Sequence, residues 1–481
     1  MLPSKRFICS RSIVWFLLAV GVVSAGKVCA DQTFDQTNPN KVWDTTTKNW
    51  DASADVWLND GTSNAIFTGT GQTLDVNDAI NVNNITFNSN GWNIGDASAP
   101  SGSLTLGAPS TITVTNSTDT ATLGVSIVGG ALTKAGAGTL VLSGTNTFTG
   151  NVIVSTGILK IANNSALGDT TGTTSVTSGA SLVLTNGVTV TGETIGINGS
   201  GINSTGALQA DAGASATWAG TITIDSQGGR VGAQSGGTLT ISGVIQNGAS
   251  NPTGVLAIGE APGSSTPGVV IISGTSNTYS GATQIVRGVL KLGANNALPA
   301  TTTVDVSSST SATEDCVFDL NGFSQTITGL QRTNTIGAGF VTNNGAAPST
   351  LTITGGANPF TGVIKDGTST VAITKSGTGT LTLAGANTYY GSDQCHRWHP
   401  QPFRFAHRHG DQRLRRDRWR SADRDEHGRH RRSHDTHREQ RQLPRRHVNL
   451  HGRRHSRRGQ YLHRRGHGRS EWQFRRVVRD Q

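Results

Sequence analysis

The stretch that decides the fold is Leu132-Thr-Lys-Ala-Gly-Ala-Gly-Thr-Leu-Val-Leu-Ser-Gly-Thr-Asn-Thr-Phe-Thr-Gly150, followed directly by Asn151-Val-Ile-Val-Ser-Thr-Gly-Ile-Leu-Lys-Ile161. Its apolar residues alternate in direction, so that Leu140 and Leu142 point to one side and Val141 to the other. Each apolar run covers four or five residues and ends at Gly or Asn, which tolerate positive φ at tight corners. The pattern predicts short β-strands joined by tight turns.

The same pattern occurs in three units along the chain. Repeat 1 covers residues 132–161, and repeat 2 covers residues 269–292. Repeat 3 is Ile373-Thr-Lys-Ser-Gly-Thr-Gly-Thr-Leu-Thr-Leu-Ala-Gly-Ala-Asn-Thr-Tyr-Tyr-Gly391, which aligns with repeat 1 without a gap. Self-similar units of this kind are typical of repeat architectures.

One such unit buries too little apolar surface to fold alone, so the units must stack. Stacked short strands form a β-solenoid, in which neighbouring rungs lie about 4.8 Å apart. We expect the aliphatic side chains at positions 159, 161, 290 and 292 to face a narrow apolar core, and Lys160 and Lys291 to face outward. Low-complexity disorder is the alternative, but Leu, Val and Ile recur at strand spacing.

Composition and charge agree with this interpretation. The 481 residues include 62 glycines, and only 34% are hydrophobic and 5% aromatic, which disfavours an ordinary globular enzyme core. The formal net charge of +10 combines two unlike segments. Residues 1–392 hold 14 Lys and Arg against 20 Asp and Glu, whereas residues 393–481 hold 26 Arg against 10 acidic residues, together with all 13 histidines.

The amino terminus has the pattern of a secretory signal peptide. Three basic residues precede an apolar run over residues 13–23, and small residues follow. We expect a signal peptide over residues 1–30, cleaved after Ala25 or Ala30. The apolar run is shorter than the roughly 20 residues that a spanning helix needs, so a retained transmembrane helix is the weaker alternative.

Cysteine usage excludes a disulfide framework. Two of the four cysteines lie in or beside the leader, Cys395 lies in the basic tail, and Cys316 is the only one in the body.

Two groups of residues are candidates for binding. The asparagines Asn146, Asn277 and Asn387 each precede Thr and an aromatic residue, and they suggest either a ladder of stacked turns or, less favoured, a ligand site. In residues 31–100, the expected cap and first strands, four tryptophans could seal the open end of the core or, alternatively, stack on carbohydrate: Trp43, Trp50, Trp57 and Trp92.

The three units resemble the autotransporter-associated β-strand repeat, which has the form Thr-Lys-x-Gly-x-Gly-Thr-Leu-x-Leu-Ser-Gly-x-Asn-Thr-Tyr-x-Gly followed by a Gly-x-Leu strand. The resemblance implies an all-β, right-handed parallel β-helix, or β-solenoid, over residues 101–391. It also implies a bacterial passenger region that is exported to the extracellular space, the cell surface or the outer membrane. The family has no catalytic residues to carry over.

The basic tail, residues 393–481, has a second interpretation, which concerns the reading frame of its codons. Read one nucleotide later, the codons for Asp393 to Gln401 allow Thr-Ser-Val-Thr-Gly-Gly-Thr-Leu, which aligns with residues 152–159 of repeat 1 and 283–290 of repeat 2. The glycine encoded across Trp398 and His399 is forced by the genetic code. We therefore hypothesise a frameshift near codons 391–393, genuine or a sequencing error, and expect a disordered tail without a function of its own.

These observations predict a non-enzymatic exported passenger with a display, adhesion or matrix role and an unknown surface or polysaccharide ligand. We expect no catalytic, cofactor-binding or metal-binding residues, and no translocator barrel within this chain.

Two alternatives stay open. One is a polysaccharide-active β-helix enzyme, although Glu314-Asp315 is the only adjacent acidic pair in the body and fits a surface turn better. The other is nucleic-acid binding through the Arg-rich tail, for which we expect no specific nucleic acid.

Overall fold

The computed structural model describes residues 31–395, apart from 52–53, 96–101, 260–265 and 308–314. The expected signal peptide and residues 396–481 of the expected tail lie outside the described residues. The described residues belong to one compact unit. Among the described residues, no helix is long and apolar enough to cross a membrane.

The structure consists of β-strands in four sheets, with one short 3-10 helix, η1 (Ile202–Ser204). All strand-to-strand pairings are parallel. The 22-stranded sheet contains β1 (Asp31–Thr33), β2 (Val42–Trp43), β3 (Asn64–Phe67), β4 (Thr73–Val76), β6 (Ile85–Phe87), β7 (Trp92–Ile94), β9 (Ser110–Val114), β10 (Thr120–Leu123), β12 (Leu132–Ala135), β13 (Thr139–Leu142), β14 (Val152–Val154), β15 (Ile158–Ile161), β16 (Thr173–Val176), β17 (Ser181–Leu184), β19 (Thr194–Gly199), β20 (Leu208–Ala210), β22 (Thr221–Ala233), β24 (Ile245–Asn247), β25 (Leu256–Gly259), β27 (Thr283–Ile285), β29 (Thr303–Val306) and β32 (Gly329–Gln331).

The other three sheets are smaller. The three-stranded sheet contains β5 (Ala79–Val82), β8 (Ser103–Leu106) and β11 (Ser126–Gly129). The eight-stranded sheet contains β18 (Thr189–Val190), β21 (Ser215–Trp218), β23 (Thr238–Ile241), β26 (Val269–Ile272), β28 (Gly288–Leu292), β30 (Asp315–Asp319), β33 (Ala338–Thr342) and β35 (Val363–Ile364). The four-stranded sheet contains β31 (Gln325–Ile327), β34 (Ser349–Ile353), β36 (Val371–Lys375) and β37 (Asp393–Cys395).

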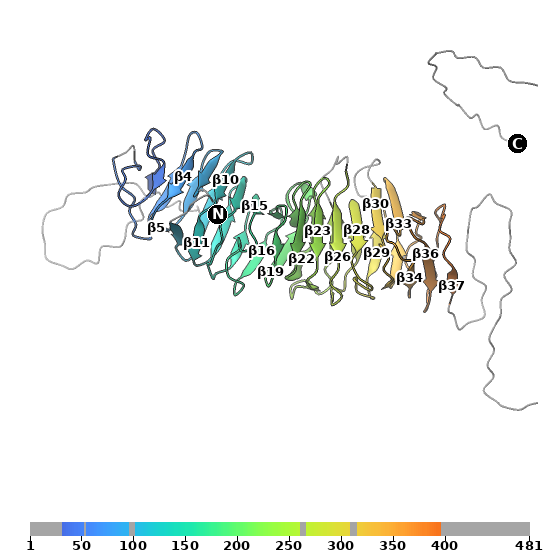
Figure 1. Cartoon of the computed structure of the whole chain (residues 1–481). Coiled ribbons are helices and arrows are strands. Elements are labelled where there is room, and N and C mark those ends of the chain that lie inside the picture. The colour runs from blue at the N-terminus through green and yellow to red at the C-terminus, as the bar shows by residue number, and fades with distance from the viewer. Residues whose placement is uncertain (1–30, 52–53, 96–101, 260–265, 308–314, 396–481) are drawn as a thin grey trace, which may run out of the picture. The chain divides into compact units, whose positions relative to one another are not determined.

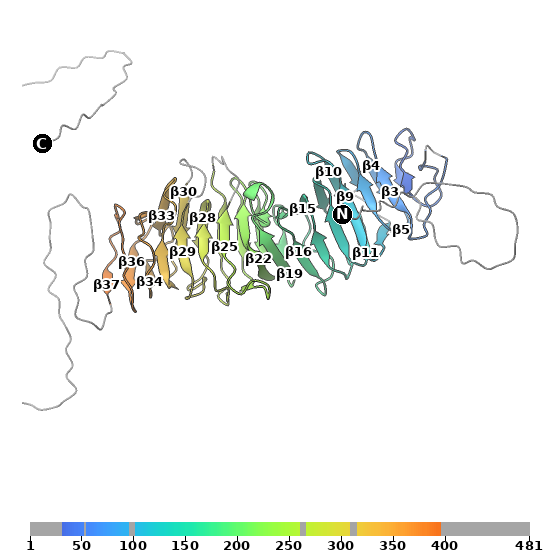
Figure 2. The same ribbon diagram turned by 180° about the vertical axis from the view of Figure 1, so that it is seen from behind.

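The strands stack as the rungs of a solenoid. β13 pairs with β15, and β15 pairs with β17, so that Leu140, Leu159 and Leu182 lie in one column. The stack has about 14 turns, and its strands follow one another in chain order (Figures 1 and 2). The predicted parallel β-solenoid is confirmed.

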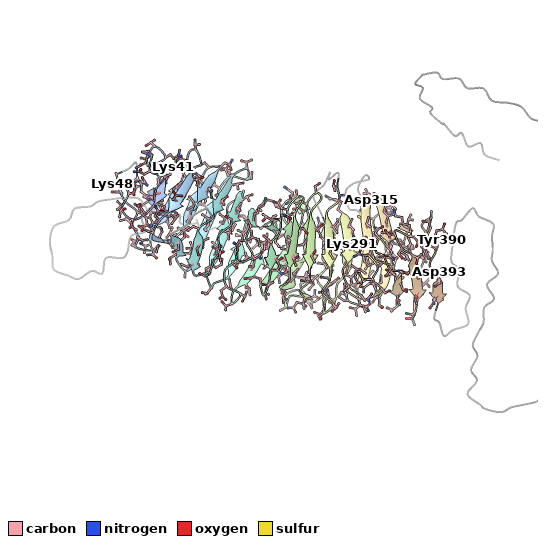
Figure 3. All side chains as sticks on the ribbon, in the orientation of Figure 1. Lys41, Lys48, Lys291, Asp315, Tyr390 and Asp393 are labelled. Atoms are coloured by element: carbon pink, nitrogen blue, oxygen red, sulfur yellow. The ribbon has the colours of Figure 1, made fainter. Side chains whose placement is uncertain are left out.

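The core is the narrow apolar column that period-two alternation predicts. The side chains at positions 159, 161, 290 and 292 are all 0% exposed. Lys160 and Lys291 point outward: Lys160 Nζ lies 2.7 Å from Asp211 Oδ2, and Lys291 Nζ, labelled in Figure 3, lies 3.8 Å from Asp319 Oδ2. The predicted inward and outward directions of these residues are confirmed.

A cluster of aromatic rings fills the first turns. The Trp50 ring centroid lies 5.2 Å from that of Trp43, 4.7 Å from that of Trp57 and 5.5 Å from that of Phe34. The Trp92 ring packs edge-on against Phe34, with the centroids 5.8 Å apart. All four tryptophans are buried, which fits the sealing role and leaves no exposed indole face for carbohydrate stacking.

The start of the predicted disordered tail needs a correction. Asp393–Cys395 form β37, which pairs with β36 so that Ile373 lies opposite Asp393. The prediction of disorder from residue 393 is therefore wrong for these three residues. The edge of β36 offers unpaired backbone groups, and β37 takes the place that Val152–Val154 has in repeat 1, where Leu132 lies opposite Val152.

Candidate functional site

The most regular surface of the solenoid is a row of outward side chains on one sheet, which we call the outward ladder. Parallel pairing brings one residue from each of seven stacked strands into register: β9, β12, β14, β16, β19, β22 and β24. The ladder consists of Thr111, Thr133, Ile153, Ser175, Gly196, Thr223 and Gln246. It has no charged member, and Ile153, which is 39% exposed, lies near its middle.

The ladder is held in place by the core beneath it. Six of the seven ladder residues are flanked along their strands by buried residues on both sides, as Ile153 is by Val152 and Val154. Gln246 is flanked by buried Ile245 and half-buried Asn247. Because the flanking residues are fixed in the apolar column, the outward residues keep a constant spacing of about 4.8 Å from rung to rung. The result is a preorganised row of small hydroxyl and amide groups, with one carboxylate beside it: a Cβ on Gly196 would lie 2.6 Å from Asp225 Oδ2.

A polar groove of about 410 Å³ follows one corner of the solenoid beside β22. Glycines form the corner because neighbouring backbones approach closely there: a Cβ on Gly220 would lie 1.8 Å from Glu193 O, and one on Gly243 would lie 1.9 Å from Gly220 O. The groove is lined by Gly192, Ala219, Gly220, Thr221, Ser242, Gly243, Val244, Ser273, Gly274, Thr275 and Ser276. Such a lining offers backbone and hydroxyl hydrogen bonds but no group for acid-base chemistry.

Glu193 lies in this glycine corner and is only 4% exposed. Burial, together with the nearby charge of Asp169, raises the pKa of the Glu193 carboxyl to about 7. Sequence reasoning missed this residue, because nothing in its local pattern distinguishes it from an exposed turn glutamate.

The three candidate asparagines connect neighbouring rungs. Asn146 Oδ1 accepts a hydrogen bond from the Ile127 N–H at 2.9 Å, and its Nδ2 donates to Ala166 O at 2.7 Å. Asn277 makes the equivalent bonds with Ile245 N and Ala297 O, at 2.6 and 2.7 Å. These buried amides are occupied by the fold, which supports the ladder interpretation over a ligand site.

Two lysines of the repeats were not singled out by the sequence. Lys134 is 0% exposed, and its Nζ donates to Ala135 O, Gly136 O and Thr156 O at 2.8 to 3.0 Å. Lys375, at the equivalent position of repeat 3, also turns inward onto backbone carbonyls. Burial lowers the pKa of Lys134 to about 8. Both lysines fix a corner of the solenoid.

The described residues contain no group of three or more His, Cys, Asp or Glu side chains that could hold a metal ion. Asp315 is exposed at the start of β30, whereas its neighbour Glu314 lies outside the described residues.

Comparisons with known proteins agree with the repeat pattern. The model of the passenger-associated-transport repeat matches residues 132–161, 267–292 and 373–392, the three units found in the sequence. The chain is 32% identical over 291 residues to the adhesin BmaC autotransporter of Brucella suis biovar 1 (strain 1330). That alignment covers 55% of this chain and 8% of the relative's length. No solved structure matches the chain.

The chain is therefore a parallel β-solenoid that contains three matches to the passenger-associated-transport repeat and is similar, over 55% of its length, to an autotransporter adhesin.

Proposed function

We propose that this chain is a non-enzymatic, adhesion-type passenger, exported to the bacterial surface, which binds its ligand through the outward ladder. The observation that carries the proposal is the register of seven uncharged outward residues on seven strands that stack directly on one another. The relative named an adhesin supports the same class of function. The repeat match supports export.

The ladder suits an extended, uncharged polymer, such as a surface polysaccharide. Seven positions at about 4.8 Å per step span about 29 Å, so many weak polar contacts add along one line. The rigid β-strands minimise the entropy lost when such a ligand binds. Ile153, the third residue of the row, adds one apolar contact.

A pair of matched variants tests this face. In the full chain, Ser175→Lys with Thr223→Lys places two charges in the ladder, and Thr217→Lys with Thr240→Lys places two charges on the adjoining pair β21 and β23. The assay measures binding of the purified chain to epithelial cell monolayers, before and after enzymatic removal of surface glycans. We expect the ladder variant to lose at least about tenfold in binding and the control to keep it. Equal binding by both variants would refute the ladder as the contact surface.

The enzymatic alternative requires a separate assay. The full chain is incubated with a panel of neutral and acidic polysaccharides, and new reducing ends and unsaturated products are measured. We expect no depolymerisation. Turnover that is heat-sensitive and proportional to the amount of chain would overturn the non-enzymatic assignment.

A further inference from the structure

The end of the described solenoid presents repeat 3 without a following rung. β37 pairs with β36, and no other strand of the described residues pairs with β37. In repeat 1, the corresponding β14 is covered by β16 on its other side. Repeats 1 and 2 therefore show, residue by residue, what repeat 3 would contact if the solenoid continued.

Asn387 makes only one of the two inter-rung hydrogen bonds that Asn146 and Asn277 make in the other repeats. Its Oδ1 accepts a hydrogen bond from the Ile364 N–H of the preceding rung at 2.9 Å, as in the other two repeats. Its buried Nδ2 has no partner among the described residues. The equivalent Nδ2 atoms of Asn146 and Asn277 donate to a carbonyl twenty residues further along, in the next rung. A buried donor without a partner is rare in folded proteins and points to a missing acceptor.

The contacts of Lys375 also indicate that a following rung is missing. In repeat 1, Lys134 Nζ reaches forward to Thr156 O, at the corner that follows β14. Lys375 Nζ instead lies 3.5 Å from Thr354 O, in the preceding rung.

The pair Tyr389 and Asp393 indicates which residue type fits the first position of the strand that pairs with β36. In repeat 2, the buried Tyr279 hydroxyl lies 2.7 Å from Thr283 Oγ1, four residues later. At the same spacing in repeat 3, the Tyr389 hydroxyl donates to Asp393 Oδ1 at 2.8 Å. Asp393, labelled in Figure 3, and Gln394 are exposed. The corresponding strands of repeats 1 and 2 bury their first and third residues. A buried β-branched residue belongs at position 393, where this frame has a carboxylate.

The corner after this strand requires glycine. Gly157 and Gly288 have φ of +70° and +76°, and a Cβ on Gly157 would lie 2.5 Å from the carbonyl oxygens of Gly136 and Gly138. The equivalent residue of this chain is Trp398. In repeat 1, the strand after the corner buries Leu159 and Ile161. The equivalent residues of repeat 3 are Pro400 and Pro402, which lack the backbone N–H that a strand donates.

We infer that the solenoid end at β36 is an acceptor edge for one more rung, and that its occupant, which starts in the place that β37 holds, is the rung encoded in the reading frame displaced by one nucleotide. That frame allows Thr at position 393 and Val at 395, it forces Gly at 398, and it allows Leu at 400 and 402. These are the residue types that the edge requires at each position. The inference concerns the repeat end and is independent of the proposed adhesive function.

The test removes one nucleotide from codon 393 in the full gene, so that the downstream residues are read in the displaced frame. Hydrogen exchange is then compared between this restored chain and the chain as it exists. We expect the amides of β36 and of residues 393–395 to exchange at least about tenfold more slowly in the restored chain. The amides of β12, far from the change, serve as the internal control and should not differ.

A matched control keeps tryptophan at position 398 of the restored chain. It should lose the added protection, because the equivalent glycines of repeats 1 and 2 have positive φ and a Cβ on Gly157 would meet two carbonyl oxygens. Unchanged exchange in the restored chain, or equal protection with glycine and tryptophan at this position, would overturn the inference. Failure of the restored chain to fold would show as lost protection in β12 and would also count against it, since a native continuation should not disturb the stack.

Discussion

Repeats 1 and 3 are nearly the same sequence in two different surroundings. In repeat 1, Leu142 pairs with Leu123 of the rung before and Ile161 of the rung after. In repeat 3, the aligned Leu383 makes a single bridge, to Phe360 of the rung before. Regular strand β13 is present in repeat 1, whereas the aligned residues of repeat 3 form only that bridge.

The difference shows that the repeat sequence alone does not make a complete rung. The aromatic residue of repeat 1, Phe148, is 0% exposed, whereas the aligned Tyr389 is only partly buried, and Tyr390 beside it is 89% exposed at the end labelled in Figure 3. Each rung obtains its burial and half of its inter-rung hydrogen bonds from the next one, as expected for a one-dimensional stack.

The largest expected effect comes from core truncation. Leu142→Ala should lower the free energy of unfolding around β13 by about 3 kcal/mol, because the cavity is enclosed by rungs on both sides. Leu383→Ala should lower it by about 1 kcal/mol, since an end rung can collapse into the space. Urea-dependent hydrogen exchange at β13 and β36 measures both. Equal losses would remove the distinction between the two repeats.

Substitution of a corner glycine should have the next largest effect. Gly157→Ala is expected to destabilise by about 2 kcal/mol, from its left-handed backbone and from the two carbonyl oxygens that a Cβ would meet. Gly187→Ala is the matched control, because its φ is +80° but no atom lies within 4 Å of the added Cβ. Gly187→Ala should lower the free energy of unfolding by about 1 kcal/mol. If Gly187→Ala proved as costly as Gly157→Ala, close approach between rungs would not be the reason for glycine at this corner.

The asparagines offer a comparison within one residue type. Asn146→Ala should cost about 2 kcal/mol, because it leaves both Ile127 N and Ala166 O without their bonds. Asn387→Ala should cost about 1 kcal/mol or less, since it removes one bond and also one unpaired buried donor. Thermal unfolding of the two variants, each beside the unaltered chain, distinguishes the cases. A larger loss for Asn387→Ala would contradict the account of the open end.

The smallest expected effect is a pH dependence from Lys134. Its pKa in the folded chain is lowered from 10.5 to about 8, so between these values the unfolded chain binds more protons. Stability should therefore rise with pH from about 8 to 10.5. Lys134→Met should remove this rise while lowering stability throughout, because three carbonyls lose a donor. Urea unfolding of both chains at pH 7.5, 8.5 and 9.5 checks the sign. A variant that keeps the full rise would assign the titration to another group.

Much of this structure could be predicted from local pattern. Period-two alternation in residues 139–142 and 158–161 was sufficient for the stacked strands, because one face of each must be buried. The same alternation contains the signal for Lys134, which lies two residues after Leu132 and so on its inward side. Because lysines are almost always exposed, the inward position of Lys134 was not predicted from this pattern.

Other features depend on contacts that no local pattern encodes. The outward ladder exists because seven strands share one register. The sequence alone does not show which residue of one rung lies opposite which residue of the next. Glu193 is 4% exposed in a corner where a neighbouring rung brings Gly220 against its backbone, a contact far away in sequence. β37 forms on an available edge, although Asp393 and Gln394 are exposed and contribute little to the core.

The central claim is that one repeat sequence is well ordered between two rungs and weakly held at an end. The most direct measurement is hydrogen exchange of the full chain, comparing the amides of β12 and β14 in repeat 1 with those of β36 and β37 in repeat 3. We predict exchange at least about a hundredfold slower in repeat 1 than in repeat 3. Equal protection of the two repeats would contradict the account.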